Sequence, residues 1–230
     1  MKIRIKFKKY GVMKFIGHLD VMRYFQKLLR RADIPIAYTS GMSPHQIMSF
    51  AMPLGIGIES DAEYVDIEIT ERITSDIAIK RMNDNSVEGI DILSFRELPE
   101  DSVNAMASIS SADYEVRFRD GFKPSFDCLK ILSELYDGPG IEVLKKTKKS
   151  ESITDIKPGI FGFEQNGDSL NMCLSCGSAL NIKPELVLGA IYAHVGEELD
   201  EYSLLIKRKE IYTTIGTDRV SLDDIGADIR

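Results

Sequence analysis

The sequence predicts an α+β protein made of two ferredoxin-like units, each a βαββαβ arrangement with an antiparallel sheet. Three observations predict this fold class. Strand-like and helix-like segments follow one another in the required order, and the order begins again after a small, polar stretch at residues 98–111. Apolar positions of the first part also recur in the second at a constant spacing of 107 residues. We therefore expect a first unit at residues 1–97, a linker at 98–111 and a second unit at 112–230.

The first unit opens with a strand and a helix of clear periodicity. Apolar residues alternate with basic ones at the start of the chain, which is typical of a strand with one buried face. Residues 19–33 form an amphipathic helix, because apolar side chains recur at steps of three and four and basic ones fall on the opposite side. Asp20 lies in its first turn, where a carboxylate faces the positive end of the helix dipole. Pro35 prevents continuation of the helix, so a strand is expected at 34–39.

The other elements follow from shorter patterns. In the first unit, strands are expected at 46–51, 63–71 and 87–95, with a helix at 76–82. In the second unit, a strand near Tyr114 and a helix and strand that repeat 19–36 precede elements at 152–157, 168–175, 184–195 and 202–213. The glycines at 159, 162 and 167 match no phosphate-binding spacing and are interpreted as turns.

The repeat keeps apolar positions and loses polar ones. Phe15, Leu19, Met22, Phe25, Leu28, Ile34 and Ile36 correspond to Phe122, Phe126, Leu129, Leu132, Leu135, Ile141 and Val143. His18 becomes Ser125, and the basic face of the first helix becomes Lys130, Glu134, Asp137 and Gly138. We therefore expect any activity beyond folding to lie in the first unit.

Charge is distributed unevenly along the chain. The net charge is -7, yet residues 1–50 hold ten Lys and Arg against two Asp, which leaves 19 basic and 34 acidic residues for the remainder. A polyanion would be attracted to the first part and repelled by the rest. Alternatively, the charges complement each other inside the fold. Arg4 and Lys6 are expected opposite Asp66 and Glu68 on a paired strand, which explains both rows without a ligand.

Cysteine content and hydropathy indicate the cellular compartment. Three cysteines are too few for a disulfide framework, no apolar run is long enough to span a membrane, and the first residues lack a signal-peptide core. We therefore expect a cytoplasmic protein with no membrane association. Cys173 and Cys176 have no second pair of ligands, and the CxxxCxxC cluster motif is absent, so neither a metal nor a cofactor is expected.

One part of the sequence resembles a known family. The segments GHLDVMR, RRADIPIAYTSGMSPHQIMSF, PLGIGIES and EYVDIEI resemble the radical-SAM-associated domain of unknown function. Members occur alone or joined to radical-SAM proteins with a cobalamin-type domain. The resemblance is dense over residues 14–69 and looser beyond, and Met42 and Gln46 replace an aromatic residue and a proline of the usual pattern. It implies a radical-SAM protein as partner and does not define a reaction.

Two groups of residues are candidate binding sites. His18, Asp20, Ser43 and His45 are expected to line one pocket for an anionic ligand, with Arg23 at its rim. Alternatively, His18 caps the helix and His45 braces a turn. The second group is the basic helix face, Arg23, Lys27, Arg30 and Arg31, which is expected to contact nucleic acid.

These observations favour a non-catalytic role. We expect an RNA-binding or substrate-presenting accessory protein of a radical-SAM enzyme of the RNA-modification type, with no catalytic residue of its own. A metal-independent endoribonuclease-like protein is one alternative, because some RNA-processing nucleases share a duplicated ferredoxin-like fold, although fold analogy alone is weak support for chemistry. A plain protein-interaction module is the other.

Overall fold

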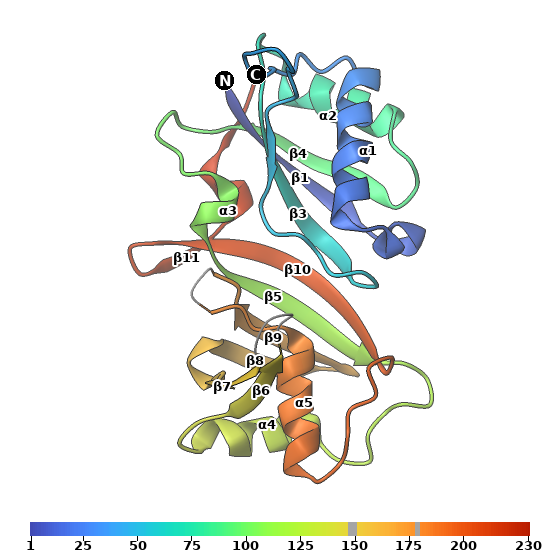
Figure 1. The fold of residues 1–230 in the computed structure, drawn as a ribbon, viewed down its shortest axis with the longest axis vertical. Coiled ribbons are helices and arrows are strands. Elements are labelled where there is room, and N and C mark those ends of the chain that lie inside the picture. Colours follow the sequence, from blue (N-terminus) through green and yellow to red (C-terminus); the bar gives the residue numbers. More distant parts are fainter. Residues whose placement is uncertain (147–150, 178–179) are drawn as a thin grey trace. The chain divides into compact units, whose positions relative to one another are not determined.

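The computed structural model describes residues 1–146, 151–177 and 180–230. It is a mixed α/β structure with mostly antiparallel strand pairing and, among the described residues, helices α1 to α5 (Figure 1). The chain divides into two compact units, one made of Met1–Ser110 with Arg208–Arg230 and the other of Ser111–Lys207. The boundary after Ser110 falls within the expected linker. The C-terminal residues, however, belong to the first unit, whereas the sequence placed them in the second.

The first six elements of the first unit alternate as β, α, β, β, α and β. They are β1 (Lys2–Lys9), α1 (His18–Arg31), β2 (Met48–Phe50), β3 (Glu59–Glu68), α2 (Ser75–Asp84) and β4 (Ile90–Glu97), with the 3-10 helix η1 (Gly11–Phe15) between β1 and α1. The unit is completed by α3 (Ala105–Ser108), by β10 (Leu204–Ile215) from Arg208 onwards, and by β11 (Asp218–Ser221), η3 (Leu222–Ile225) and β12 (Ala227–Asp228). The strand order is β12-β4-β1-β3-β10, and β2 also pairs with β3.

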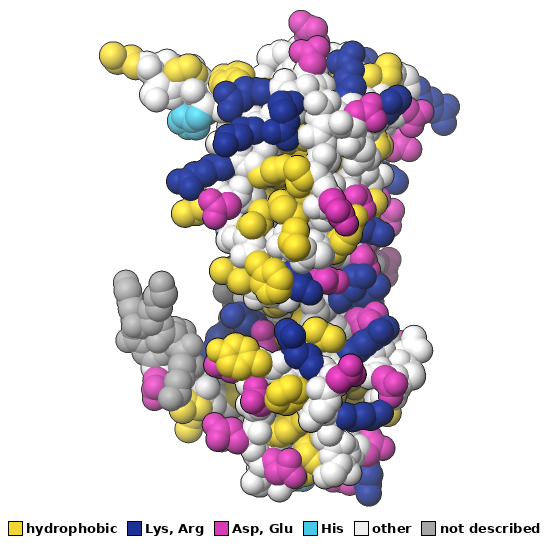
Figure 2. All heavy atoms as spheres, turned by 90° about the vertical axis from the view of Figure 1, so that its right-hand side faces the viewer, with side chains coloured by type: hydrophobic (Ala, Val, Ile, Leu, Met, Phe, Trp, Pro, Cys, Tyr) yellow, Lys and Arg dark blue, Asp and Glu magenta, His cyan; other side chains and the backbone are white. Residues whose placement is uncertain are grey.

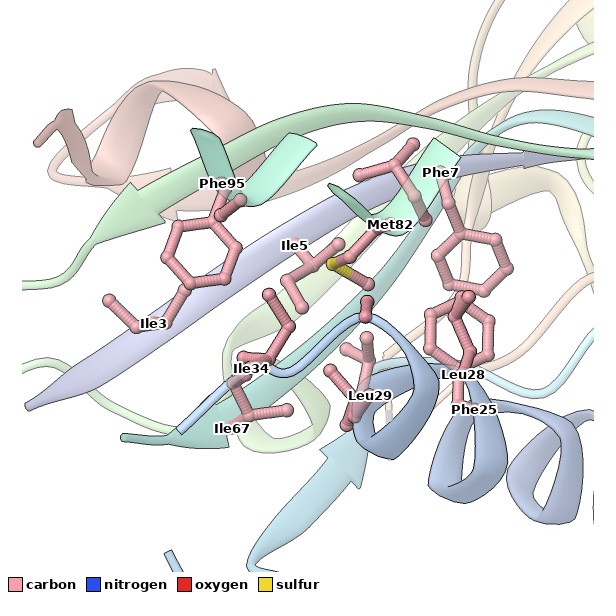
Figure 3. Close-up of a cluster of buried hydrophobic side chains, with 14 of the residues drawn as sticks. Ile3, Ile5, Phe7, Phe25, Leu28, Leu29, Ile34, Ile67, Met82 and Phe95 are labelled. Carbon is pink, nitrogen blue, oxygen red and sulfur yellow. The ribbon is translucent and has the colours of Figure 1, made fainter. Parts of the chain in front are cut away.

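Helices α1 and α2 cover one face of this sheet and enclose the core (Figure 3). The strands contribute Ile3, Ile5 and Phe7 together with Ile67 and Phe95, all almost fully buried. Helix α1 buries Val21, Phe25, Leu28 and Leu29, one apolar face as its periodicity predicts. The rings of Phe7 and Phe25 lie 4.5 Å apart between their centroids, so strand β1 and helix α1 are held by direct aromatic packing.

The pairing of β1 with β3 fixes both apolar and charged neighbours. Ile5 lies opposite Val65, and Arg4 lies opposite Asp66. The Arg4 guanidinium donates two hydrogen bonds to the Asp66 carboxylate at 2.8 and 2.9 Å, a bidentate geometry that is stronger than a single contact. The expected pairing of opposite charges across these strands is therefore present at Arg4, whereas Lys6 lies opposite Tyr64.

The C-terminal segment covers the other face of the sheet with a polar layer. Lys6 Nζ lies 2.6 Å from Glu210 Oε2, and the Tyr64 hydroxyl donates to Glu210 at 2.5 Å. Burial, followed by the neighbouring Glu210 charge, strongly raises the pKa of Tyr64, so this hydroxyl stays protonated. Ser94 donates to Asp223 of η3 at 2.5 Å. Because these side chains are satisfied by the chain's last residues, the face is closed to an RNA ligand.

Two stretches of the first unit differ from expectation. Residues 34–39 do not form a regular strand; only the bridges Ile36 to Ile69 and Tyr38 to Gln46 are present, and the second strand is β2 instead. Pro35 lacks the N–H that a regular ladder needs. The expected linker is also structured, because Asn104 caps α3 by accepting from the Met106 N–H.

The second unit has its own antiparallel sheet. Its elements are β5 (Ile109–Phe118), α4 (Cys128–Asp137), β6 (Glu142–Lys146), β7 (Glu151–Asp155), the 3-10 helix η2 (Lys157–Gly159), β8 (Ile160–Asn166), β9 (Ser169–Ser175) and α5 (Pro184–His194). Strand β9 lies between β5 and β8, while β6 and β7 form a separate hairpin. Helices α4 and α5 contact each other, and the Phe126 and Tyr192 rings lie 5.0 Å apart.

Strand β8 was missed, because its glycines were interpreted as turns. Gly162 lies inside β8, opposite Cys173 of β9. Gly167 does form the turn between the two strands, with a φ of +58° that favours glycine.

Candidate nucleic-acid interface and the His18 pocket

The outward face of α1 carries four exposed cations, the side chains of Arg23, Lys27, Arg30 and Arg31. Figure 2 shows Lys and Arg side chains gathered in the upper part of the view, where Figure 1 places α1. Arg30 and Arg31 also lie in the last turn of the helix, where cations are stabilised by its negative end. The charged face predicted from the sequence is therefore accessible to solvent.

These cations are weakly neutralised by their neighbours. Arg23 lies 3.3 Å from Asp20, with both side chains more than half exposed. Arg30 and Arg31 donate to backbone carbonyls, those of Gln26 at 3.1 Å and Asn85 at 3.0 Å. Within the described ranges, Asp20 is the carboxylate at ion-pair distance from this face. Most of its positive charge is thus available to an external polyanion.

His18 begins α1 and lies beside the core. Gly17 precedes it as the N-cap residue, so no side chain caps this helix end. The His18 imidazole contacts the Phe50 ring edge to face, with 5.3 Å between the ring centroids. It lines a small cavity together with Lys9, Phe50, Met52 and Glu63. The cavity volume is about 10 Å³, room for one water molecule.

Three buried charges lie at this cavity or next to it: Lys9 and Glu63 line it, and Arg208 contacts Glu63. Lys9 is 2% exposed, Glu63 is 6% exposed and Arg208 is 1% exposed. Arg208 donates to the Glu63 carboxylate and to the Met52 carbonyl, the latter at 2.9 Å. The Lys9 ammonium donates to the Ile16 carbonyl at 3.2 Å, just before α1. Burial lowers the pKa of Lys9; Glu63 raises it again and Arg208 lowers it further.

These three residues were not predicted from the sequence as part of a site, although a signal for two of them exists. Lys9 continues the inward alternation of Ile3, Ile5 and Phe7, and Glu63 precedes Val65 in the inward alternation of its strand. A charged residue at an inward strand position is rarely buried without a partner. Arg208 could not be matched to them, because only the tertiary structure brings β10 against β3.

Ser43 and His45 lie in an exposed loop away from the His18 cavity. His45 Nδ1 lies 3.0 Å from the Ser43 carbonyl oxygen, and its backbone N–H donates to Thr39 Oγ1 at 3.1 Å. The next residue, Gln46, donates to the Gln26 carbonyl at 3.3 Å. Gln26 follows His18 by eight residues of α1, about 12 Å along the helix.

The four residues expected in one pocket are therefore separated by the structure. His18 faces the cavity, Asp20 is exposed and pairs with Arg23, and Ser43 and His45 brace a turn. That each of them contributes to ligand binding stays a prediction, and it now concerns separate sites instead of one pocket.

Other candidate ligand residues lie apart. No group of three or more His, Cys, Asp or Glu that could hold a metal occurs in the part of the chain that the structure describes. Cys173 is half-buried on β9 and Cys176 is buried just after it, while burial raises the pKa of the Cys128 thiol to about 11. His194 ends α5. No helix among the described residues is long and apolar enough to cross a membrane.

Comparison with family models identifies the class to which the chain belongs. Residues 2–184 match the model described as "Uncharacterized protein conserved in bacteria (DUF2344)". The chain is therefore a member of this bacterial family. The match covers α1, the His18 cavity lining and most of the second unit, and it ends as α5 begins.

Neither curated proteins nor the similar solved structure described below indicates a function for the chain. A comparison with curated proteins found no match. Among solved structures, a heavy metal efflux pump in its second crystal form is similar with 7% identity and a TM-score of 0.25, over 93% of this chain and 28% of that one. The chain thus spans less than a third of that protein, and a likeness this distant carries no argument about fold or function.

Proposed function

We propose that this protein is a non-catalytic RNA-binding or substrate-presenting accessory protein, and that the exposed basic face of α1 is its RNA-binding surface. The observation that supports this proposal most directly is the arrangement of Arg23, Lys27, Arg30 and Arg31 on one solvent-facing side, with Asp20 as the nearby carboxylate. Phosphate contacts by Lys and Arg supply most of the affinity of sequence-independent nucleic-acid binding.

Two finer structural proposals accompany it. We infer that both units are ferredoxin-like and arose by duplication, since each begins with a strand, a helix and two further strands. We also propose that the enzyme served is a radical-SAM protein and that both act in the cytoplasm. The support is the sequence resemblance at residues 14–69, together with the absence of the cluster-binding CxxxCxxC motif from this chain.

RNA binding can be tested directly by charge removal with a matched control. The test variant replaces Arg23, Lys27, Arg30 and Arg31 by alanine. The control variant replaces four exposed cations elsewhere, Lys80, Arg117, Lys123 and Lys130, and changes the net charge equally. The affinity for RNA should fall strongly in the test variant and little in the control variant. Equal affinities in all three proteins would remove the α1 face from the proposal.

The same incubation tests the endoribonuclease alternative. Cleavage of RNA by the pure protein without added metal would favour a nuclease. The separation of His18 from His45 offers no paired acid and base of the kind that metal-free RNA cleavage uses. We therefore keep binding without cleavage as the proposed activity.

A further inference from the structure

We infer that the RNA ligand is single-stranded and that exposed apolar residues at the start of α1, led by Phe15, form a platform on which its bases stack. This inference deepens the proposed function and rests on it, because α1 must first bind the phosphates. It concerns a different set of side chains, which the basic face alone does not explain.

The platform is made of large apolar side chains that remain in solvent. Val12 is 75% exposed, Phe15 61%, Leu19 61% and Ile56 68%. Phe15 ends η1 and Leu19 lies in the first turn of α1. The Gly57 N–H donates to the Lys14 carbonyl at 2.9 Å, which brings the loop that carries Ile56 beside η1. Four such residues in one neighbourhood of a folded unit indicate a binding surface.

The platform and the cations share one line along the helix. Leu19, Arg23 and Lys27 follow one another at intervals of four residues, so they lie on the same face of α1. In Figure 2 hydrophobic side chains appear directly below the basic ones on one face. A ligand that lies along α1 therefore meets cations over most of the helix and apolar side chains at its beginning.

This combination is complementary to a single-stranded nucleic acid. Unpaired bases stack on aromatic side chains while phosphates follow a positive groove. In a duplex the base faces are stacked on each other, so the apolar side chains would have no partner. The Lys14 ammonium lies 5.5 Å from the centroid of the Phe15 ring and is paired with Glu59 at 2.9 Å, while Phe15 itself stays 61% exposed and accessible to a base. An apolar helix from a protein would fit the platform and leave the adjacent cations unmatched.

The test compares three probes: a 12-nucleotide RNA, its duplex, and polyphosphate of similar length, which has the charge and lacks the bases. The wild type should prefer the single strand to the duplex. The variant Phe15→Ala/Leu19→Ala should lose about ten-fold in affinity for the single strand and keep its affinity for polyphosphate. A matched control, Phe161→Ala/Ile153→Ala, removes similarly exposed apolar groups from the second unit. It should change neither the affinity for single-stranded RNA nor the affinity for polyphosphate.

A spectroscopic variant makes the stacking visible. The sequence contains no tryptophan, so Phe15→Trp introduces a single indole at the platform. Its fluorescence should be quenched by the single-stranded RNA and unaffected by polyphosphate. If Phe15→Trp keeps the affinity for single-stranded RNA and its fluorescence is quenched, the result would support stacking of a base on the ring at position 15.

The outcomes separate this inference from the proposed function. If RNA binds through the α1 cations while Phe15→Ala/Leu19→Ala binds it normally, the platform is overturned and the proposed function stands. If the variant loses polyphosphate binding equally, the apolar residues merely support α1 and the platform is again overturned. Absence of any RNA binding would overturn both.

Discussion

Arg208 and Glu63 form an ion pair in which both side chains are almost excluded from solvent, with 1% and 8% of their surfaces exposed. The two residues are 145 positions apart in the chain. Glu63 belongs to the part of the sequence that carries the family resemblance, and Arg208 lies beyond the family match. The pair therefore connects the N-terminal part of the first unit to the segment that completes it.

Breaking this pair from one side should destabilise the protein strongly. Arg208→Met leaves the Glu63 carboxylate buried with one ionic partner fewer, and removal of one member of a buried pair typically costs about 3–5 kcal/mol. Urea unfolding followed by circular dichroism should show this loss. The double variant Arg208→Met/Glu63→Leu should recover most of it, because no unpaired carboxylate remains. An equal loss in the double variant would mean that the pair's ionic character does not matter.

Lys9 should make stability depend on pH in the alkaline range. Its pKa is lowered in the folded protein, so above that lowered value the unfolded chain binds more protons than the folded one. Stability contributed by Lys9 therefore rises with pH between its folded pKa and about 10.4, the unfolded value. Urea unfolding at a series of pH values should show the wild type gaining relative to Lys9→Met. A constant difference would place the Lys9 ammonium in a better solvated position.

The two histidines of the first unit should behave differently when replaced. His18→Ala removes a ring packed against Phe50 and should cost about 1 kcal/mol. His45→Ala changes an exposed turn and should leave the midpoint of thermal unfolding nearly unchanged. Scanning calorimetry of both single variants measures the difference. Equal losses would indicate that His45 contacts the core.

Removal of residues 208–230 should disrupt the first unit selectively. The deletion takes away Arg208, Glu210 and the η3 segment, and so exposes Tyr64 and Arg4 of the sheet. Hydrogen exchange should show loss of protection in β1, β3 and β4, with protection retained in α4 and α5. Addition of a peptide of residues 208–230 should restore it, whereas a scrambled peptide should not.

Local periodicity predicted most elements, and tertiary context decided the rest. The helix at 19–33 was predicted to within two residues of α1, because one strong apolar face is readable in sequence. Strand β8 was missed because its glycines carry turn signals that a sheet can override, whereas β2 lies within the strand expected at 46–51. The return of residues 208–230 to the first unit could not be predicted, since nothing local marks the strand against which β10 pairs.

The residues of the candidate site also divide into those that local sequence predicts and those that depend on tertiary contacts. The exposed cations of α1 were predicted because an amphipathic helix shows its solvent face in the sequence. The buried cluster of Lys9, Glu63 and Arg208 was missed, since its meaning depends on a contact between distant strands. His18 and His45 were expected to be close because they lie at the two ends of one helix–loop segment, whereas Gln46 contacts Gln26 in the middle of α1 and His45 does not line the His18 cavity.

The return of the C-terminal segment to the first unit has a consequence for biosynthesis. Residues 208–230 are translated after all of the second unit, 111–207. Domains usually fold as units and in order from the N-terminus. Here the first unit cannot be completed until residues 208–230 have been made and Arg208 can meet Glu63, so it is finished after the second unit. During that interval the polar side chains of its sheet, Arg4, Tyr64 and Ser94, lack the partners that residues 210–223 provide.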